Sequence, residues 1–189
     1  MLTATYSLVA MSAEQDKTRS RLSRLQQYLQ SSWKGLQAID FSFLETAFSK
    51  LLQCEKYFRT RKLERYLIPA LRGAGREAEM LVAELDALSA KGMSYLRAVG
   101  DQLSGAAGSG TLKVGELCHA MQRYCDCLAV RIEREERELI PLARRVLSVE
   151  EWFAVAAQFL ADDGASDGRH AARARAAGFG ARHPTIINR

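Results

Sequence analysis

The sequence predicts an all-α fold: an antiparallel up-down four-helix bundle with a short fifth helix and a flexible C-terminal tail. Its 189 residues include only three prolines and are rich in Ala, Leu, Arg, Glu and Gln, which are strong helix formers. Apolar residues recur at helical spacing in four long segments joined by short connections. Two of these segments end alike, in Glu-Arg-Tyr-Leu-Ile-Pro at 64–69 and Glu-Arg-Glu-Leu-Ile-Pro at 136–141. This repeat indicates two equivalent helices in one bundle.

The composition divides the chain into two parts. We expect residues 1–163 to form the bundle and residues 164–189 to form a basic, flexible tail, because Gly, Ala and Arg dominate there. The net charge is +5, and near the C-terminus five arginines face three aspartates. No aromatic residues are interleaved with a basic patch, so nucleic acid is not an expected partner. The five arginines near the C-terminus are Arg169, Arg173, Arg175, Arg182 and Arg189, and the three aspartates are Asp162, Asp163 and Asp167.

The first two predicted helices lie in the N-terminal third of the chain. Residues 1–11 are predicted to be an extended segment before the first helix. Their alternation of apolar and polar residues is too short to predict a strand. A helix over 12–33 follows, and Gly35 ends it. Asp40 is a suitable N-cap for a helix that runs to Pro69, where the ring removes a backbone donor. The inward residues are Thr18, Leu22, Leu25 and Leu29 in the first helix, and Phe41, Leu44, Phe48, Leu51 and Phe58 in the second.

The remaining helices follow a turn at Gly73 and Gly75. The third is predicted over 76–103, with Gly92 as a weak point, and a flexible connection over 104–110 separates it from a fourth helix over 111–146. Ser148 and Glu151 form a capping box for the fifth helix. The apolar positions are Met80, Leu81, Leu85, Leu88 and Leu96 in the third helix, Leu117, Met121, Tyr124, Leu128 and Leu139 in the fourth, and Trp152, Phe153 and Phe159 in the fifth.

Targeting signals and cysteine spacing indicate the cellular compartment in which the protein is expected. The start of the chain has no basic region followed by an apolar run, and no apolar run approaches the length of a membrane span, so we expect a cytoplasmic protein that does not bind membranes. The four cysteines fall inside predicted helices with neither zinc nor disulfide spacing, which is typical of reduced thiols. They are Cys54, Cys118, Cys125 and Cys127.

The two helix ends and the segment after the second resemble a known family. Residues 135–148 and 150–152, with the matching Leu-Ile-Pro at 67–69, resemble bacterial hemerythrin-like proteins, and the likeness extends over residues 2–163. Members of that family hold two irons inside a four-helix bundle through histidines and carboxylates, and bind or sense oxygen, nitric oxide or iron. The resemblance therefore implies a di-iron site between the helices.

The family's ligand positions hold other residues in this chain. Its histidine and glutamate lie ten and six positions before the proline, which gives Arg131 and Glu135 in the fourth helix. The same count gives Arg59 and Leu63 in the second helix, with Glu64 beside them. In the first and third helices the resemblance places Gln15 and Met80 where histidine is expected. The three histidines are His119, which is predicted to face away from the core, and His170 and His183 in the tail.

Charge suggests what fills the site. We expect Arg59 and Arg131 to point inward and to pair with Glu135 and with acids of the first and third helices, because an unpaired buried charge costs several kcal/mol. Guanidinium groups bind carboxylates bidentately and suit such a cluster. In the alternative arrangement both arginines extend to the end of the bundle and stay hydrated. The candidate acids are Asp16, Glu77 and Glu79.

Three functions remain open from the sequence. The first is a non-enzymatic binding or regulatory module that has lost its di-iron site and uses no cofactor; its partner is a protein, or a small anion held where the irons were. The second is an atypical iron-binding protein that uses Glu135, Glu64, Gln15 and nearby acids. The third is a redox sensor, which requires a low-pKa exposed thiol at Cys125 or Cys127.

Overall fold

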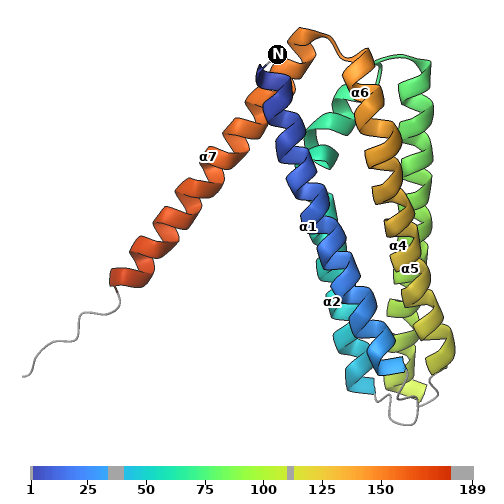
Figure 1. The fold of residues 1–189 in the computed structure, drawn as a ribbon. Coiled ribbons are helices and arrows are strands. Elements are labelled where there is room, and N and C mark those ends of the chain that lie inside the picture. Colours follow the sequence, from blue (N-terminus) through green and yellow to red (C-terminus); the bar gives the residue numbers. More distant parts are fainter. Residues whose placement is uncertain (1, 34–40, 110–112, 180–189) are drawn as a thin grey trace, which may run out of the picture.

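Long helices lying side by side make up the body of the molecule (Figure 1). The computed structural model describes residues 2–33, 41–109 and 113–179, and side chains at 5–31, 41–105 and 113–165. The long helices are α1 (Leu2–Trp33), α2 (Phe41–Arg59), α4 (Arg76–Ser109) and α5 (Val114–Arg134). Both α1 and α4 contact α2 and α5, so each long helix borders two others. All regular secondary structure in the described ranges is helical, which confirms the all-α prediction.

The two repeated segments form wide, π-helical turns. These are η1 (Leu63–Leu67), followed by α3 (Ile68–Leu71), and η2 (Glu135–Leu139), followed by α6 (Ile140–Val146). In each, an amide bonds the carbonyl five residues back: Ile68 to Leu63, and Ile140 to Glu135. A proline follows at once in both segments, and its ring clashes with the carbonyl four residues earlier. Widening the helix before the proline relieves that clash.

Three helix boundaries differ from the sequence predictions. Residues 1–11 were predicted to be extended, yet α1 begins at Leu2 and buries Ser7 and Met11 against other helices. The fifth helix was predicted to be short, but α7 (Val149–Phe179) continues well past residue 163. The third helix was predicted to end at residue 103, but α4 continues to Ser109, through the connection that was predicted to be flexible. In α7, an Ala-rich stretch continues a helix that packing has begun. Gly35, Asp40 and the last ten residues lie outside the described ranges.

The caps and turns follow local rules that the sequence displays. Gly73 and Gly75 have φ of 91° and 114°, the left-handed region that glycine adopts without strain. The capping box of α7 is formed as predicted: the Ser148 amide donates to Glu151 Oε2 at 2.7 Å, and the Glu151 amide donates to Ser148 Oγ at 3.2 Å. Gly92 lies within α4 without breaking it. Among the described helices, none is long and apolar enough to cross a membrane.

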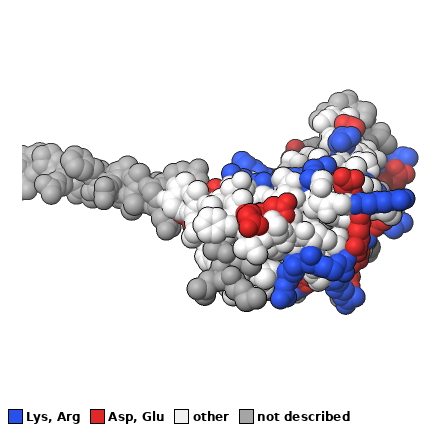
Figure 2. All heavy atoms as spheres, turned by 90° about the horizontal axis from the view of Figure 1, so that it is seen from above, with Lys and Arg blue, Asp and Glu red and all other residues white. Residues whose placement is uncertain are grey.

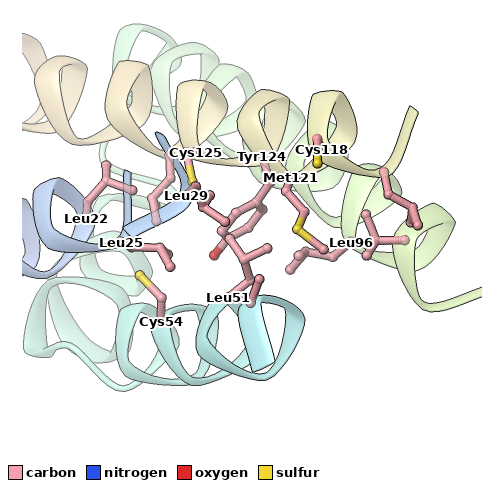
Figure 3. Close-up of a cluster of buried hydrophobic side chains, with 14 of the residues drawn as sticks. Leu22, Leu25, Leu29, Leu51, Cys54, Leu96, Cys118, Met121, Tyr124 and Cys125 are labelled. Atoms are coloured by element: carbon pink, nitrogen blue, oxygen red, sulfur yellow. The ribbon is translucent and has the colours of Figure 1, made fainter. Parts of the chain in front are cut away.

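The apolar core falls into two clusters along the length of the helices. One lies between α1, α2, α4 and α5 and includes Leu25, Leu51 and Tyr124 (Figure 3). The other includes Leu67, Leu139 and Phe159 and joins η1, α3, α6 and α7 to the first part of α1 and α4. The predicted inward stripes of the first and fourth helices are buried throughout. In the other helices Phe41, Met80 and Phe153 are exposed, contrary to prediction.

Candidate functional site

Five polar side chains meet in the interior of the helix assembly. They are Gln15 of α1, Arg61 and Glu64 near the start of η1, Arg131 of α5, and Glu135, which begins η2. Gln15, Arg61, Arg131 and Glu135 are at most 2% exposed, and the Glu64 side chain is 10% exposed. We call these five residues the buried Arg–Glu network.

Arg61 bonds to four neighbours. Its Nη2 donates to Glu135 Oε1 at 2.9 Å and to Glu64 Oε1 at 3.2 Å. Its Nη1 donates to Gln15 Oε1 at 2.7 Å, and its Nε donates to the Phe58 carbonyl at 3.2 Å. Gln15 completes the ring of contacts, because its Nε2 donates to Glu135 Oε2 at 2.9 Å. All three nitrogens of this guanidinium group therefore have acceptors.

Arg131 reaches the same two carboxylates from the other side. Its Nε donates to Glu135 Oε1 at 3.1 Å, and its Nη2 donates to Glu64 Oε1 at 2.7 Å. Its Nη1 donates to the carbonyl of Leu85 at 2.7 Å and to the hydroxyl of Ser89, both on α4. Residues of α1, α4 and α5 and of both wide turns are thus joined in one cluster.

The network balances its charges and satisfies its polar atoms. Two guanidinium groups face two carboxylates, and among the described side chains the one buried polar atom without a partner is Gln122 Oε1, outside the network. The Phe58 ring lies against both cations, with its centre 3.9 Å from Arg61 Cζ and 5.1 Å from Arg131 Cζ. A fully bonded cluster of this kind avoids the penalty of an unpaired buried charge.

Burial and neighbouring charges shift the pKa values of the cluster. Burial is the largest influence on Glu64 and raises its pKa; the Glu135 carboxylate raises it further, while Arg131 and Arg61 oppose both. Burial disfavours the charged form of Arg61, but the carboxylates of Glu135 and Glu64 outweigh burial and raise its pKa. Arg61 therefore remains a cation in the interior.

The network forms a polar layer between the two apolar clusters. Along α1, Gln15 follows Met11 of one cluster and precedes Leu22 of the other. The same order recurs between α2 and η1, where Arg61 separates Phe58 from Leu63. On α5 and η2, Glu135 lies between Ile132 and Leu139, which again belong to different clusters. Each of these helical segments therefore passes from one core to the other through this layer.

Four of the residues singled out in the sequence meet here. Gln15, Glu64, Arg131 and Glu135 belong to the network, and Arg131 pairs with Glu135 as predicted. Leu63 is buried in the apolar cluster beside them. Met80 does not reach the site, because its side chain is 55% exposed on the outside of α4.

The inward arginine of the second helix is Arg61, and the prediction of Arg59 was wrong. Arg59 is half-exposed and its Nε bonds Glu55 on its own helix at 2.7 Å. The count from the proline assumed a regular helix, but α2 ends at Arg59 and the wide turn η1 then changes the angle per residue. The sequence contains one sign of this two-residue offset, the spacing between arginine and glutamate. It is three residues from Arg61 to Glu64, but four residues from Arg131 to Glu135.

The acids proposed as partners are also elsewhere. Asp16, Glu77 and Glu79 are exposed, and their places are taken by Glu64 and by the amide of Gln15. Glu77 instead pairs with Arg145, and Asp16 lies near Arg19. The alternative in which the arginines stay hydrated does not hold for Arg61 or Arg131, since both are buried.

The residues present do not fit a di-iron centre. Histidine ligands are missing from the network, His119 is exposed on α5, and both buried carboxylates bind guanidinium groups. Within the described ranges, no group of three or more His, Cys, Asp and Glu residues is placed to hold a metal ion. His183 lies outside those ranges, and His170 is on the part of α7 without described side chains.

The cysteines lack the property that a redox sensor needs. Burial raises the pKa of Cys125 to about 12 and that of Cys54 to about 11, and both point into the first apolar cluster (Figure 3). Cys127 is half-buried, and burial raises its pKa as well. A reactive thiol requires a lowered pKa and access to solvent.

Comparison with protein-family models, with curated proteins and with solved structures finds no match to this chain.

Proposed function

We propose that this chain is a hemerythrin-like four-helix bundle whose metal site has been replaced by the buried Arg–Glu network, and that it acts as a non-enzymatic binding or regulatory module. The observation that carries the proposal is the pairing of Arg61 and Arg131 with Glu64 and Glu135 at the centre of the helices. In this arrangement two organic cations supply the positive charge that metal ions supply in the family the chain resembles.

The geometry of the helix ends supports the bundle. Glu64 and Glu135 come from the two repeated segments and accept bonds from the same pair of arginines. Carboxylates from different helices are also what a di-iron bundle uses to bind its metals. In this chain Glu135 occupies the family's glutamate position, Glu64 follows Leu63, which occupies the other, and the cations differ.

A non-enzymatic role is supported by the state of the polar groups. Catalytic groups need access to a substrate and an unsatisfied bonding position. The nitrogens of Arg61 and Arg131 already have acceptors, and the hollow beside Arg131 has a volume of about 10 Å³, close to the size of one water molecule. A small substrate has no room there.

The same argument favours a protein partner over a small anion. An anion in the core would have to displace carboxylates that bind two guanidinium groups each. On the outer surface, Lys and Arg side chains lie beside Asp and Glu on the face shown in Figure 2. A mixed surface of this kind suits another protein better than it suits a nucleic acid, which selects a continuous basic patch.

Metal analysis of protein purified from iron-supplemented cells tests the proposal. We expect far less than one iron per chain, no absorption band of an oxo-bridged iron pair, and a thermal midpoint that neither ferrous iron nor a chelator changes. Recovery of about two irons per chain with that absorption band would overturn the proposal and favour the iron-binding alternative. The variant Arg131→His is the matched comparison, because it restores an imidazole at the family position while keeping Glu135.

A further inference from the structure

Residues 61–66, which we call the η1 segment, have two faces with different partners. Arg61 and Glu64 point inward and belong to the buried Arg–Glu network. Lys62 and Arg65 point outward and bind carboxylates of α7. Neighbouring residues of one short segment therefore hold the interior and an outer helix at the same time.

Two ion pairs join the η1 segment to α7. Lys62 Nζ lies 2.5 Å from Asp163 Oδ1, and Arg65 Nη1 lies 2.7 Å from Asp162 Oδ2. Asp163 also accepts a bond from the Tyr6 hydroxyl of α1 at 2.6 Å. Beyond these residues α7 diverges from α1 (Figure 1). The polar attachment of α7 is thus concentrated at the point where it meets the η1 segment.

Apolar side chains reinforce the same junction. The rings of Tyr66 and Phe159 pack against each other with their centres 5.8 Å apart. Leu63 and Leu67 of η1 and Trp152 of α7 are buried in one apolar cluster. Movement of α7 away from this junction therefore uncovers η1 itself.

The backbone of the η1 segment is interrupted on both sides. Before it, α2 ends at Arg59 and residues 60–61 form a turn; after it comes Pro69, which has no amide to donate. The π-helical turn between them is a rare conformation that occurs mostly in single turns. From α1, Glu14 Oε2 accepts a bond from the Lys62 amide at 2.8 Å. Because the segment is positioned by such contacts, losing those on one face should displace it and weaken those on the other.

We propose that the η1 segment couples α7 to the buried Arg–Glu network: detachment of α7 loosens the network, and loss of the network detaches α7. Coupling of this kind is reciprocal, because both directions share one free energy. The position of an outer helix then depends on the state of the interior, which gives a binding module a means of regulation. This inference rests on the contacts of the network and does not depend on whether the network replaced a metal site.

Release of α7 tests the coupling. The double variant Asp162→Asn, Asp163→Asn removes both carboxylates that the η1 segment binds and leaves every network residue in place. We expect lower hydrogen-exchange protection factors in α7 over residues 149–163. We also expect the Cys54 thiol, which is buried near Arg61, to react with a thiol reagent about fivefold faster or more at constant pH.

The variant Asp86→Asn is the matched control. It removes an exposed carboxylate of α4 that pairs with Arg72 at 2.8 Å and has no contact with α7 or the network. Both the protection of α7 and the rate at Cys54 should remain at their wild-type values.

A double-mutant cycle separates coupling from a general loss of stability. Glu64→Gln removes one carboxylate of the network. Independent substitutions multiply their effects on the rate at Cys54, whereas coupled ones do not. We expect the Asp162→Asn, Asp163→Asn variant to accelerate Cys54 less in the Glu64→Gln background than in the wild type. Equal factors in both backgrounds, an unchanged rate at Cys54, or an α7 that keeps its protection in the double variant would each overturn the proposal.

Discussion

Arg61 and Arg131 are stable in the interior because each is bonded to both Glu64 and Glu135. Placing an ion in a protein interior costs several kcal/mol, and the attraction between partners repays that cost only when nearly every donor has an acceptor. The network meets this condition with carboxylates, one amide, a hydroxyl and backbone carbonyls. Removing one cation leaves two carboxylates sharing the other, in a site that water barely reaches.

We predict that Arg61→Met lowers the free energy of unfolding by about 3–5 kcal/mol, the cost of breaking a buried ion pair. Arg59→Met is the control, two positions away in the same segment. It should cost less than about 1 kcal/mol, because Arg59 is half-exposed and pairs with Glu55 within one helix. Urea denaturation at constant pH and salt measures both. Equal losses in the two variants would contradict the assignment of Arg61 to the interior.

The sequence was sufficient to predict the inward residues wherever the helix is regular. Thr18, Leu22 and Leu29 are buried as expected, and Arg131 meets Glu135 one turn away on α5. The prediction failed at Arg59, because the break after α2 and the wide turn η1 change the direction in which side chains point around the helix axis. A regular helical period does not predict that change. For the same reason Glu64 was predicted to lie beside the site, whereas it occupies the inward position that was expected for Leu63.

At the scale of elements, the wide turns and α7 are connected. The turn η1 supplies Glu64 to the network and, from its other side, Arg65 to Asp162 of α7. Asp163 also accepts bonds from Lys62 Nζ at 2.5 Å and from the Tyr6 hydroxyl at 2.6 Å. The extent of α7 was not predictable from composition, because Gly and Ala in the tail resemble a flexible segment until a packed helix continues into them.

We predict that acid weakens the attachment of α7. Hydrogen bonds from Lys62 and Tyr6 lower the pKa of Asp163 below the usual value of 3.8 for an aspartate. A lowered pKa contributes stability that is present above 3.8 and is lost as the pH falls through the folded-state value. The hydrogen-exchange protection factors of α7, which are corrected for the pH dependence of the chemical exchange step, should therefore fall below that pH. Because Asp163 is partly exposed, the effect should stay under about 1 kcal/mol.

The variant Asp163→Asn is the control for this pH dependence. It removes the titrating group, so the protection factors of α7 should be lower than in the wild type at neutral pH and should change less between neutral and acidic conditions. If the wild type and the variant lose protection in parallel as the pH falls, the carboxylate of Asp163 is not responsible for the attachment.

At the scale of the whole molecule, a polar layer separates two apolar cores. Apolar contacts alone tolerate sliding of one helix along another, whereas a bonded cluster fixes the relative position of every helix that contributes to it. Here the cluster joins α1, η1, α4 and η2, so a single site sets the alignment of most of the body. Loss of that alignment should open both cores together.

The buried thiols provide a measure of that opening. Cys54 and Cys125 lie in the first core, on α2 and α5 (Figure 3). With their pKa values raised to about 11 and about 12, they should resist a thiol reagent at mildly alkaline pH, while the half-exposed Cys127 reacts first. In the folded protein, their reaction then follows the population of the open state.

We predict that Arg61→Met accelerates the reaction of Cys54 and Cys125 by about a hundredfold or more, the factor that corresponds to a loss of about 3 kcal/mol. Arg59→Met should leave their rates close to the wild type, and Cys127 should react at similar rates in all three proteins. Mass spectrometry of the modified peptides assigns each thiol. If Arg61→Met left the rates of Cys54 and Cys125 unchanged, the buried Arg–Glu network would not hold the first core closed.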